Sequence, residues 1–163
     1  MPLHVVILAA GQGKRMHSAL PKVLHRLAGR PLLAHVLDAA RQLAPERIHV
    51  VVGHAGKQVK AAFEGADVEW VEQARQLGTG HALQQALPML PRAAAVLVLS
   101  GDVPLVLPAT LRKLVRSAGK GLAIATIDQD NPAGYGRVLR DADRKSTRLN
   151  SSHIQKSRMP SSA

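Results

Sequence analysis

The 163-residue sequence predicts an α/β domain of the Rossmann-like kind, with a mostly parallel sheet and helices on both of its faces. Short apolar runs alternate with segments whose apolar residues recur every three or four positions, which is typical of strands joined by crossover helices. Polar or glycine-rich clusters follow three of the apolar runs. Because ligands of such sheets bind beyond the carboxyl ends of the strands, these clusters indicate a ligand site at one edge of the sheet.

The strands are expected where apolar residues continue over four to eight positions. The first run leads into a pair of glycines, and the fourth leads into Gly101 and Asp102. Near-continuous apolar runs are typical of parallel strands, because both faces of such a sheet are covered. The five predicted strands are 3–10, 48–52, 68–71, 95–100 and 122–127.

The helices are expected between these strands, each with one apolar stripe. The first begins at Pro31, a residue that is favourable at the first position of a helix. Gly65 and Gly119 are placed to end the second and fourth helices, and Pro88 follows the third. The stripes are Leu33, Val36, Leu37, Ala40 and Leu43; then Val59, Ala62 and Phe63; then Ala82, Leu83, Ala86 and Leu87; and finally Leu111, Leu114 and Val115.

The composition narrows the functional classes. Hydrophobic residues make up 46% of the chain, which is enough for a core, but one Phe, one Trp and one Tyr offer little stacking for nucleic-acid bases. There is no cysteine, which excludes disulfides and thiol catalysis and fits a reducing cytoplasm. No apolar run approaches the roughly 18 residues of a membrane span. We therefore expect a cytoplasmic protein without a membrane partner.

The net charge of +11 is concentrated toward the C-terminus. Five cations and no acid follow Asp143, which leaves residues 1–143 with +6. Residues 144–163 show no helical or strand period and are rich in serine, which predicts disorder. This segment also resembles translated adaptor or vector sequence. We expect one folded domain over 1–143, interrupted near Asp143, and a non-native tail over 144–163.

The most informative cluster is the turn after the first strand, where Gly11 and Gly13 are followed by Lys14 and Arg15, with Lys22 shortly beyond. Glycines let the backbone approach a ligand closely, and cations neutralise phosphate oxygens. The spacing matches neither the P-loop nor the dinucleotide-binding turn, so an ordinary ATPase or NAD enzyme is not the first interpretation. The cluster predicts another kind of phosphate cradle; the alternative is a tight turn with solvated charges.

Asp102 directly follows the fourth strand and is the carboxylate best placed to hold a divalent cation. Mg²⁺ takes one or two carboxylates and completes its shell with water and substrate phosphates. The alternative is that Asp102 caps a helix beginning near Pro104 or Pro108. The histidines show no metal-ligand spacing. We expect the following at the surface or at the edge of the core: His4, His25, His35, His49, His54 and His81.

Gln73 and the turn Gly78-Thr79-Gly80 follow the third strand. Their amide and backbone groups suit the reading of a nucleobase edge. The alternative is a glycine-rich helix entry with Thr79 as its cap. A later turn over 131–137 has polar and aromatic character, and by itself it is compatible with a simple hairpin.

Five motifs, collinear over residues 1 to about 143, resemble the sugar-phosphate nucleotidyltransferases. More narrowly, they resemble the N-terminal uridylyltransferase domain of the bacterial bifunctional N-acetylglucosamine-1-phosphate uridylyltransferase/glucosamine-1-phosphate acetyltransferase enzymes. The motifs are LAAGQGKRM (8–16), LPKVLH (20–25), QARQLGTGHA (73–82), GDVPL (101–105) and GYGR (134–137). The resemblance implies a partial nucleotidyltransferase sandwich over 1–143, incomplete at the C-terminal end. The family's later sugar-contacting Glu and Asn, its second metal ligand and its β-helix acetyltransferase domain are not recognisable after Asp143.

The resemblance implies a role for each matching residue. Arg15 and Lys22 match the catalytic cations on the nucleotide phosphates, and Asp102 matches the ligand of Mg²⁺, the implied cofactor. The remaining matches read the nucleobase (Gln73, Gly78 and Thr79), contact the nucleotide (Leu8, Ala9, Ala10, Gly11, Gly13, Ser100 and Gly101) or lie near the sugar (Gly136).

The implied reaction joins UTP and N-acetylglucosamine 1-phosphate into UDP-N-acetylglucosamine and pyrophosphate, for peptidoglycan and lipopolysaccharide precursors. The attacking phosphate oxygen is already anionic, so the reaction requires no protein nucleophile or general base. Full-length relatives are implied to be homotrimers through the β-helix domain. The chain as written is expected to be catalytically crippled and poorly soluble, because strands that cover the sheet are missing.

Two alternatives stay open. A nucleotidyltransferase for another sugar phosphate or for CTP would keep Gly11, Lys22 and Asp102 and differ in the pockets for the base and the sugar. A basic nucleic-acid-binding module would explain the positive charge and would show salt-dependent binding. The resemblance favours a nucleotide-sugar enzyme with no nucleic-acid partner.

Overall fold

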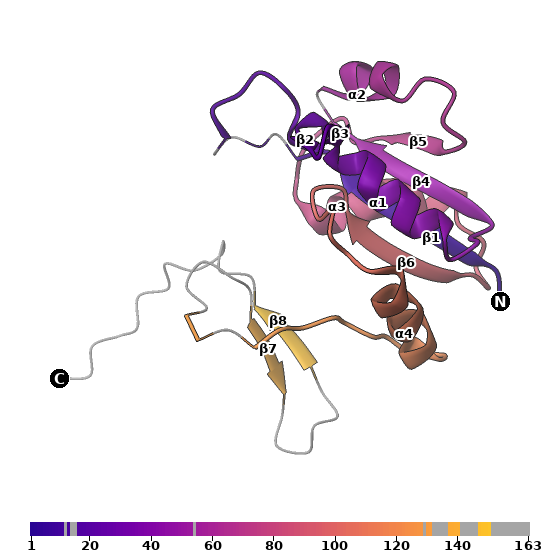
Figure 1. Cartoon of the computed structure of the whole chain (residues 1–163). Coiled ribbons are helices and arrows are strands. Elements are labelled where there is room, and N and C mark those ends of the chain that lie inside the picture. The colour runs from indigo at the N-terminus through magenta and orange to yellow at the C-terminus, as the bar shows by residue number, and fades with distance from the viewer. Residues whose placement is uncertain are drawn as a thin grey trace. The chain divides into compact units, whose positions relative to one another are not determined.

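The computed structural model of the protein describes residues 1–11, 13, 16–53, 55–128, 130–131, 137–140 and 147–150. The chain divides into two units, Met1–Ala123 and Ile124–Ala163. The first unit contains the sheet and its helices, and the second contains a short antiparallel hairpin (Figure 1).

The first unit is built on a four-stranded parallel sheet in the order β5-β4-β1-β6. The central strand β1 pairs with β4 on one side and β6 on the other, so that Val6 lies between His49 and Val98. Because all the connections return to the same end of the sheet, the carboxyl ends of the four strands share one edge. The strands are β1 (Leu3–Ala9), β4 (Arg47–Val52), β5 (Glu69–Glu72) and β6 (Ala95–Ser100).

Helices cover both faces of this sheet, as the sequence predicts. One face packs against α1 (Leu32–Arg41), α2 (Gly56–Ala62) and α4 (Pro108–Ala118), around a core that includes Ile7 and Val50. The other face packs against α3 (Thr79–Ala86), through Ala82 and Ala86 on Val6, Val51 and Val71. Figure 1 shows α1 in front of the sheet and α3 behind it. The α/β sandwich is therefore confirmed.

Several short elements complete the described chain. A 3₁₀ turn, η2 (Lys22–Leu24), follows the glycine-rich turn after β1, and a two-stranded ribbon of β2 (Arg26–Leu27) and β3 (Arg30–Pro31) leads into α1. A second 3₁₀ turn, η3 (Leu87–Met89), follows α3. In the second unit, β7 (Arg137–Arg140) pairs with β8 (Thr147–Asn150). These four β8 residues lie in the tail that we expect to be disordered; pairing with β7 gives them a strand. The other residues of the tail and the boundary at 143 lie outside the described residues, and the domain limits stay a prediction.

The predicted strand at 122–127 is wrong for the described structure, where these residues belong to no helix or strand and do not pair in a sheet. A strand requires a partner for its backbone groups, and among the described residues β6 pairs with β1 alone. Leu122 and Ile127 are consequently largely exposed.

The predicted apolar stripes of the helices face the core except at their ends. Pro31 precedes α1 instead of opening it, because its backbone is extended and belongs to β3. Ala62 and Leu87 are exposed, since each lies at or beyond the last turn of its helix and has rotated away from the sheet. Within the described part of the chain, no helix is long and apolar enough to cross a membrane.

Two histidines expected near the surface lie in the core. His4 on β1 and His49 on β4 are almost fully buried, with ring centroids 5.4 Å apart and Nδ1 of His4 3.1 Å from Nε2 of His49. Each ring supplies one nitrogen of the other with a polar partner, while Nε2 of His4 and Nδ1 of His49 are buried without a hydrogen bond.

Candidate functional site

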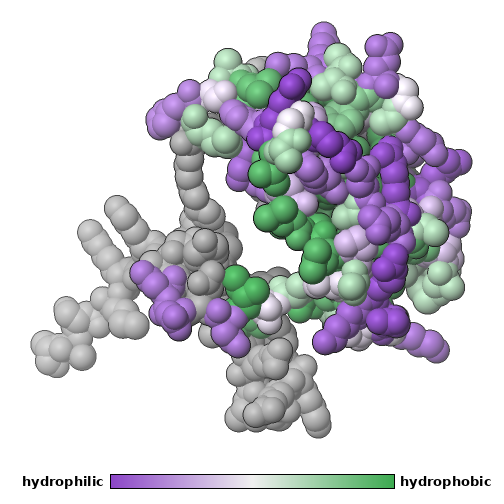
Figure 2. Space-filling view, viewed as in Figure 1, coloured by the Kyte–Doolittle hydropathy of each residue, from purple (hydrophilic) through white to green (hydrophobic). Residues whose placement is uncertain are grey.

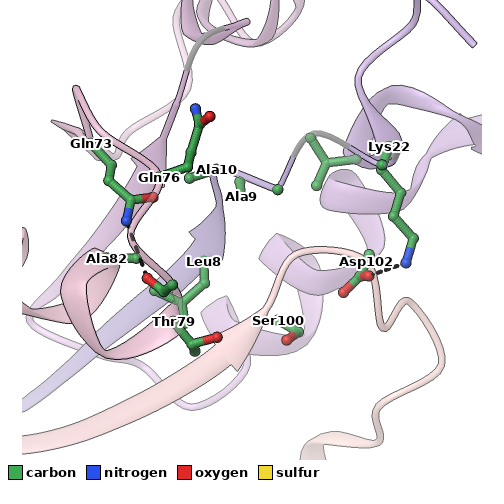
Figure 3. Close-up of a pocket in the computed structure, with 14 residues that line it drawn as sticks. Leu8, Ala9, Ala10, Lys22, Gln73, Gln76, Thr79, Ala82, Ser100 and Asp102 are labelled. Atoms are coloured by element: carbon green, nitrogen blue, oxygen red, sulfur yellow. Dashed lines mark hydrogen bonds and ion pairs between the residues drawn. The ribbon is translucent and has the colours of Figure 1, made fainter. Parts of the chain in front are cut away.

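A cavity of about 600 Å³ opens beyond the carboxyl ends of β1, β5 and β6. This volume is typical of pockets for small organic ligands. The strands end there, and the chain turns away through glycine-rich segments (Figure 3). The cavity is lined by Leu8, Ala9, Ala10, Gly11, Gly13, Lys22, Val23, Gln73, Gln76, Gly78, Thr79, Ala82, Ser100 and Asp102.

The turn after β1 forms one wall of the cavity. Gly13 has a φ of +59°, which favours glycine, and a Cβ there would come within 3.0 Å of the Cβ of Lys22. Gly11 has open space on its side-chain side. The two glycines thus let the turn fold back onto η2 while leaving backbone exposed to the cavity.

Lys22 and Asp102 face one another across this wall. Nζ of Lys22 lies 2.5 Å from Oδ2 of Asp102, and both side chains are partly buried. Figure 3 shows the pair on the side of the cavity opposite Gln73 and Thr79. The capping alternative for Asp102 is not supported, because α4 begins at Pro108 after Leu107 and has no side-chain cap. In this structure the predicted phosphate cation and the predicted metal ligand therefore neutralise each other.

The opposite wall is built around Gln73, a residue that is only 3% exposed. Its backbone N–H donates to the carbonyl of Val52 at 2.8 Å, which extends the parallel pairing beyond β5 and fixes the start of the loop. Its amide nitrogen donates to the carbonyl of Gly78 at 3.2 Å and lies 2.9 Å from Nδ1 of His81. Thr79 is not the cap of α3, because Gly78, with a φ of +105°, occupies that position.

The floor comes from the ends of two paired strands. Leu8 and Ser100 are register partners in β1 and β6, and both line the cavity. Gly101 is predicted to contact the nucleotide, but it is buried behind the lining, where its N–H donates to the carbonyl of Leu8 at 2.9 Å. A Cβ at Gly101 would lie 3.2 Å from that carbonyl oxygen and from Val23, so close packing accounts for this glycine.

Two of the predicted site residues, Arg15 and Gly136, lie outside the described residues, as does Lys14. Among the residues that are described, no three His, Cys, Asp or Glu side chains group together as a metal site. Asp102 is the one acidic side chain among the described residues that line the cavity.

Sequence reasoning missed Gln76 and Gly53. Gln76 lines the cavity beside Gln73, and the only signal for it is its place in the same polar segment. Gly53 follows β4, and a Cβ there would lie 2.8 Å from the carbonyl oxygen of Ala10 and even closer to the Gln76 amide. This glycine permits a close approach of the loops after β1 and β4, which no local pattern reveals.

The comparisons with known proteins show the family of the chain. The model of the MobA-like NTP transferase domain matches residues 5–155. A protein named bifunctional protein GlmU from Xanthomonas euvesicatoria is 59% identical over 146 residues, 89% of this chain and 32% of that protein. A protein of the same name from Stenotrophomonas maltophilia is 61% identical over 145 residues, 88% of this chain and 32% of that protein. The chain thus spans about a third of the length of these curated relatives.

A solved structure gives the same result for the fold. Rv0371c of Mycobacterium tuberculosis H37Rv, in a complex with manganese, aligns with a TM-score of 0.62 and 27% identity over 88% of this chain and 67% of that one. The range matched by the family model contains β4, β5, β6, all of β1 except its first two residues, and every residue that lines the cavity. This chain belongs to the family of MobA-like NTP transferase domains.

Proposed function

We propose that this chain carries the site at which UTP and N-acetylglucosamine 1-phosphate are joined into UDP-N-acetylglucosamine, with release of pyrophosphate. The observation that carries the proposal is the convergence of three separate segments on one cavity: the glycine turn after β1, Gln73 after β5, and Asp102 after β6. The identity of about 60% to proteins named bifunctional protein GlmU, over almost nine tenths of this chain, supports the choice of substrates.

The reaction is a displacement at phosphorus. An oxygen of the sugar 1-phosphate attacks the α-phosphorus of UTP, a new P–O bond forms, and the bond to the bridging oxygen of the β-phosphate breaks, so that pyrophosphate leaves with the electron pair. The attacking oxygen is anionic and needs no base. The protein therefore contributes by positioning and by electrostatic stabilisation.

Each wall of the cavity has a part in this reaction. The backbone at Gly11 and Gly13 receives the phosphates, and the ammonium group of Lys22 neutralises charge on the α-phosphate. Arg15 is assigned to the leaving pyrophosphate. Gln73, with Gly78 and Thr79, binds the base, and Leu8, Ala9, Ala10, Ser100 and Gly101 shape the nucleotide site. Gly136 is assigned to the sugar.

The donor set of the cavity fits Mg²⁺. A single carboxylate, Asp102, lies beside the phosphate wall, and a hard divalent cation takes one or two carboxylates together with substrate phosphates. When bound, the ion neutralises the charge that develops on the phosphate oxygens. Asp102 would hold the ion in place of Lys22, and the Lys22 ammonium group, which pairs with Asp102 in this structure, would then be available to the nucleotide.

The wider assignments rest on the same resemblance. We infer a cytoplasmic enzyme whose product supplies peptidoglycan and lipopolysaccharide synthesis, and homotrimeric assembly of the longer relatives through a domain outside this chain.

The test is nucleotide binding by the full chain, measured by titration calorimetry. Lys22→Ala is expected to weaken UTP binding in the presence of Mg²⁺ by about 10-fold to 100-fold, because a hydrogen bond between charged groups is lost. Asp102→Asn is expected to weaken binding with Mg²⁺ but to strengthen binding of metal-free UTP, since it removes a negative charge and releases Lys22.

Lys113→Ala is the matched control, because it removes the same charge from an exposed position on α4. It should leave both affinities within about twofold. Retained UTP affinity in Lys22→Ala, or an equal loss in Lys113→Ala, would remove Lys22 from the site.

A further inference from the structure

The amide of Gln73 is held in one orientation by two acceptors. Its nitrogen donates to the carbonyl of Gly78 at 3.2 Å and contacts Nδ1 of His81 at 2.9 Å. The Gly78 carbonyl also accepts the backbone N–H of Ala82 at 3.0 Å, in the first turn of α3. With the nitrogen end bound in this way, the oxygen end of the amide points toward the cavity (Figure 3).

The contact with His81 determines the tautomer of that ring. An amide NH₂ group only donates, so the Nδ1 atom that it meets carries a lone pair and no hydrogen. In the neutral ring the hydrogen then lies on Nε2, which is 3.3 Å from the amide of Gln85. The Gln85 atom nearest to Nε2 is the amide nitrogen, which only donates, so Gln85 does not accept the Nε2–H. Gln85 also lies 3.3 Å from the backbone carbonyl of His81 and is thereby kept beside the ring.

We propose that His81 is a positioning residue for nucleobase selection, which acts by holding the Gln73 amide with its oxygen toward the bound base. The proposal rests on the uridine nucleotide site proposed above. Uracil presents an N–H donor at N3, whereas cytosine presents a bare acceptor there. An oxygen at the cavity wall thus binds uracil and repels cytosine, and a rotated amide would reverse this preference.

The expected size of the effect follows from the hydrogen bond that the Gln73 amide keeps when His81 is replaced. Gly78 still accepts one hydrogen of the Gln73 amide, so the preferred orientation weakens but does not disappear. Loss of one of two buried hydrogen bonds corresponds to about a tenfold change in selectivity. Uridine preference should therefore decrease without a comparable loss of total nucleotide binding.

The experiment measures UTP and CTP affinity of the full chain with Mg²⁺ by calorimetry. His81→Leu is expected to lower the UTP-to-CTP preference about tenfold. His81→Asn should retain the preference, because its side-chain oxygen lies near the position of Nδ1. His81→Gln places its polar end farther along, near Nε2, and should not restore it. Gln84→Ala, an exposed neighbour on α3, is the control.

The outcomes separate a positioning role from a structural one. If His81→Leu weakens UTP and CTP equally, or leaves their ratio unchanged, the proposal is overturned. Circular dichroism and urea unfolding establish that each variant is folded before its ratio is used.

A second measurement on the unaltered chain is independent of nucleotide. The ¹⁵N shifts of the His81 ring are expected to show hydrogen on Nε2, and hydrogen on Nδ1 would refute the positioning role. If the unaltered chain binds UTP and CTP equally well, or binds neither nucleotide, the proposed uridine site is refuted instead.

Discussion

At the scale of single residues, the stacked rings of His4 and His49 are the least expected part of the core. Burial lowers the pKa of the His49 imidazole below its usual 6.5, and the neighbouring His4 and Arg47 act in the same direction, while Glu69 opposes them. Glu46 lies on the far side of His4, 4.0 Å from its Nε2. The folded chain therefore favours the neutral form of His49, and the unfolded chain takes up a proton near pH 6.5.

This difference predicts acid sensitivity. The stabilisation is fully present above about pH 6.5 and is lost as the pH falls below that value, because the unfolded state then binds a proton that the folded state resists. In His49→Gln, which keeps a polar partner for His4 and does not titrate, the free energy of unfolding should fall less steeply between about pH 7 and 5.5. The difference in slope approaches ~1.4 kcal/mol per pH unit at most.

The measurement is urea unfolding at a series of pH values. His35→Gln removes a histidine near the surface, hydrogen-bonded to the carbonyl of Leu27, and should leave the slope unchanged. Identical slopes for His49→Gln and the unaltered chain would show that His49 does not contribute to the pH dependence.

Some features of the site were predictable from the local sequence, and others depend on contacts between distant segments. Gly11, Gln73 and Asp102 were predictable because each follows an apolar run, and parallel strands bring such ends to one edge. The pairing of Lys22 with Asp102 was not, since it depends on how the turn after β1 folds back. The burial of His4 likewise depends on the register between strands.

At the scale of elements, β6 is one of the two edge strands of the described sheet, with β5 at the other edge. Among the described residues β6 pairs only with β1, and α3 covers the sheet beside it. Val96 and Val98 on this face are 41% and 39% exposed. Figure 2 views the other face of the sheet, on the side of α1, where hydrophobic and hydrophilic residues are mixed. An apolar edge strand of this kind favours pairing with another chain.

Val98→Lys is expected to reduce self-association, because a charge on an edge strand opposes strand pairing. Light scattering over a range of concentrations should show a mass nearer to that of the monomer. The free energy of unfolding should change by no more than about 0.5 kcal/mol, since the side chain is partly exposed. Gln84→Lys adds the same charge on α3; an equal effect there would point to net charge instead of the edge.

The four strands of the parallel sheet and the four helices were predictable because periodicity reports which faces are buried. The short strands β2, β3, β7 and β8 were not predicted. The run at 122–127 has the composition of a strand, but composition supplies no partner. The same reasoning that located β6 therefore failed for this segment.

At the scale of the whole molecule, the cavity belongs to a single unit. All its lining residues lie between Leu8 and Asp102, within Met1–Ala123. A chain ending at residue 123 should unfold cooperatively in urea and bind UTP with an affinity within about threefold of the full chain. A chain ending at 143 serves as the intermediate, which removes the basic tail together with β8 and keeps β7. Non-cooperative unfolding of the 1–123 chain would contradict the division into units.

The order of the strands also bears on how the cavity is assembled. β1 pairs with β6, and the paired residues are roughly 90 positions apart in the chain. β6 leads directly to Asp102. Closing so long a loop makes this pairing slow compared with formation of the local helices. The floor and the acidic wall of the cavity are thus completed late in folding, and a nucleotide present during refolding would meet the glycine turn before it met the carboxylate.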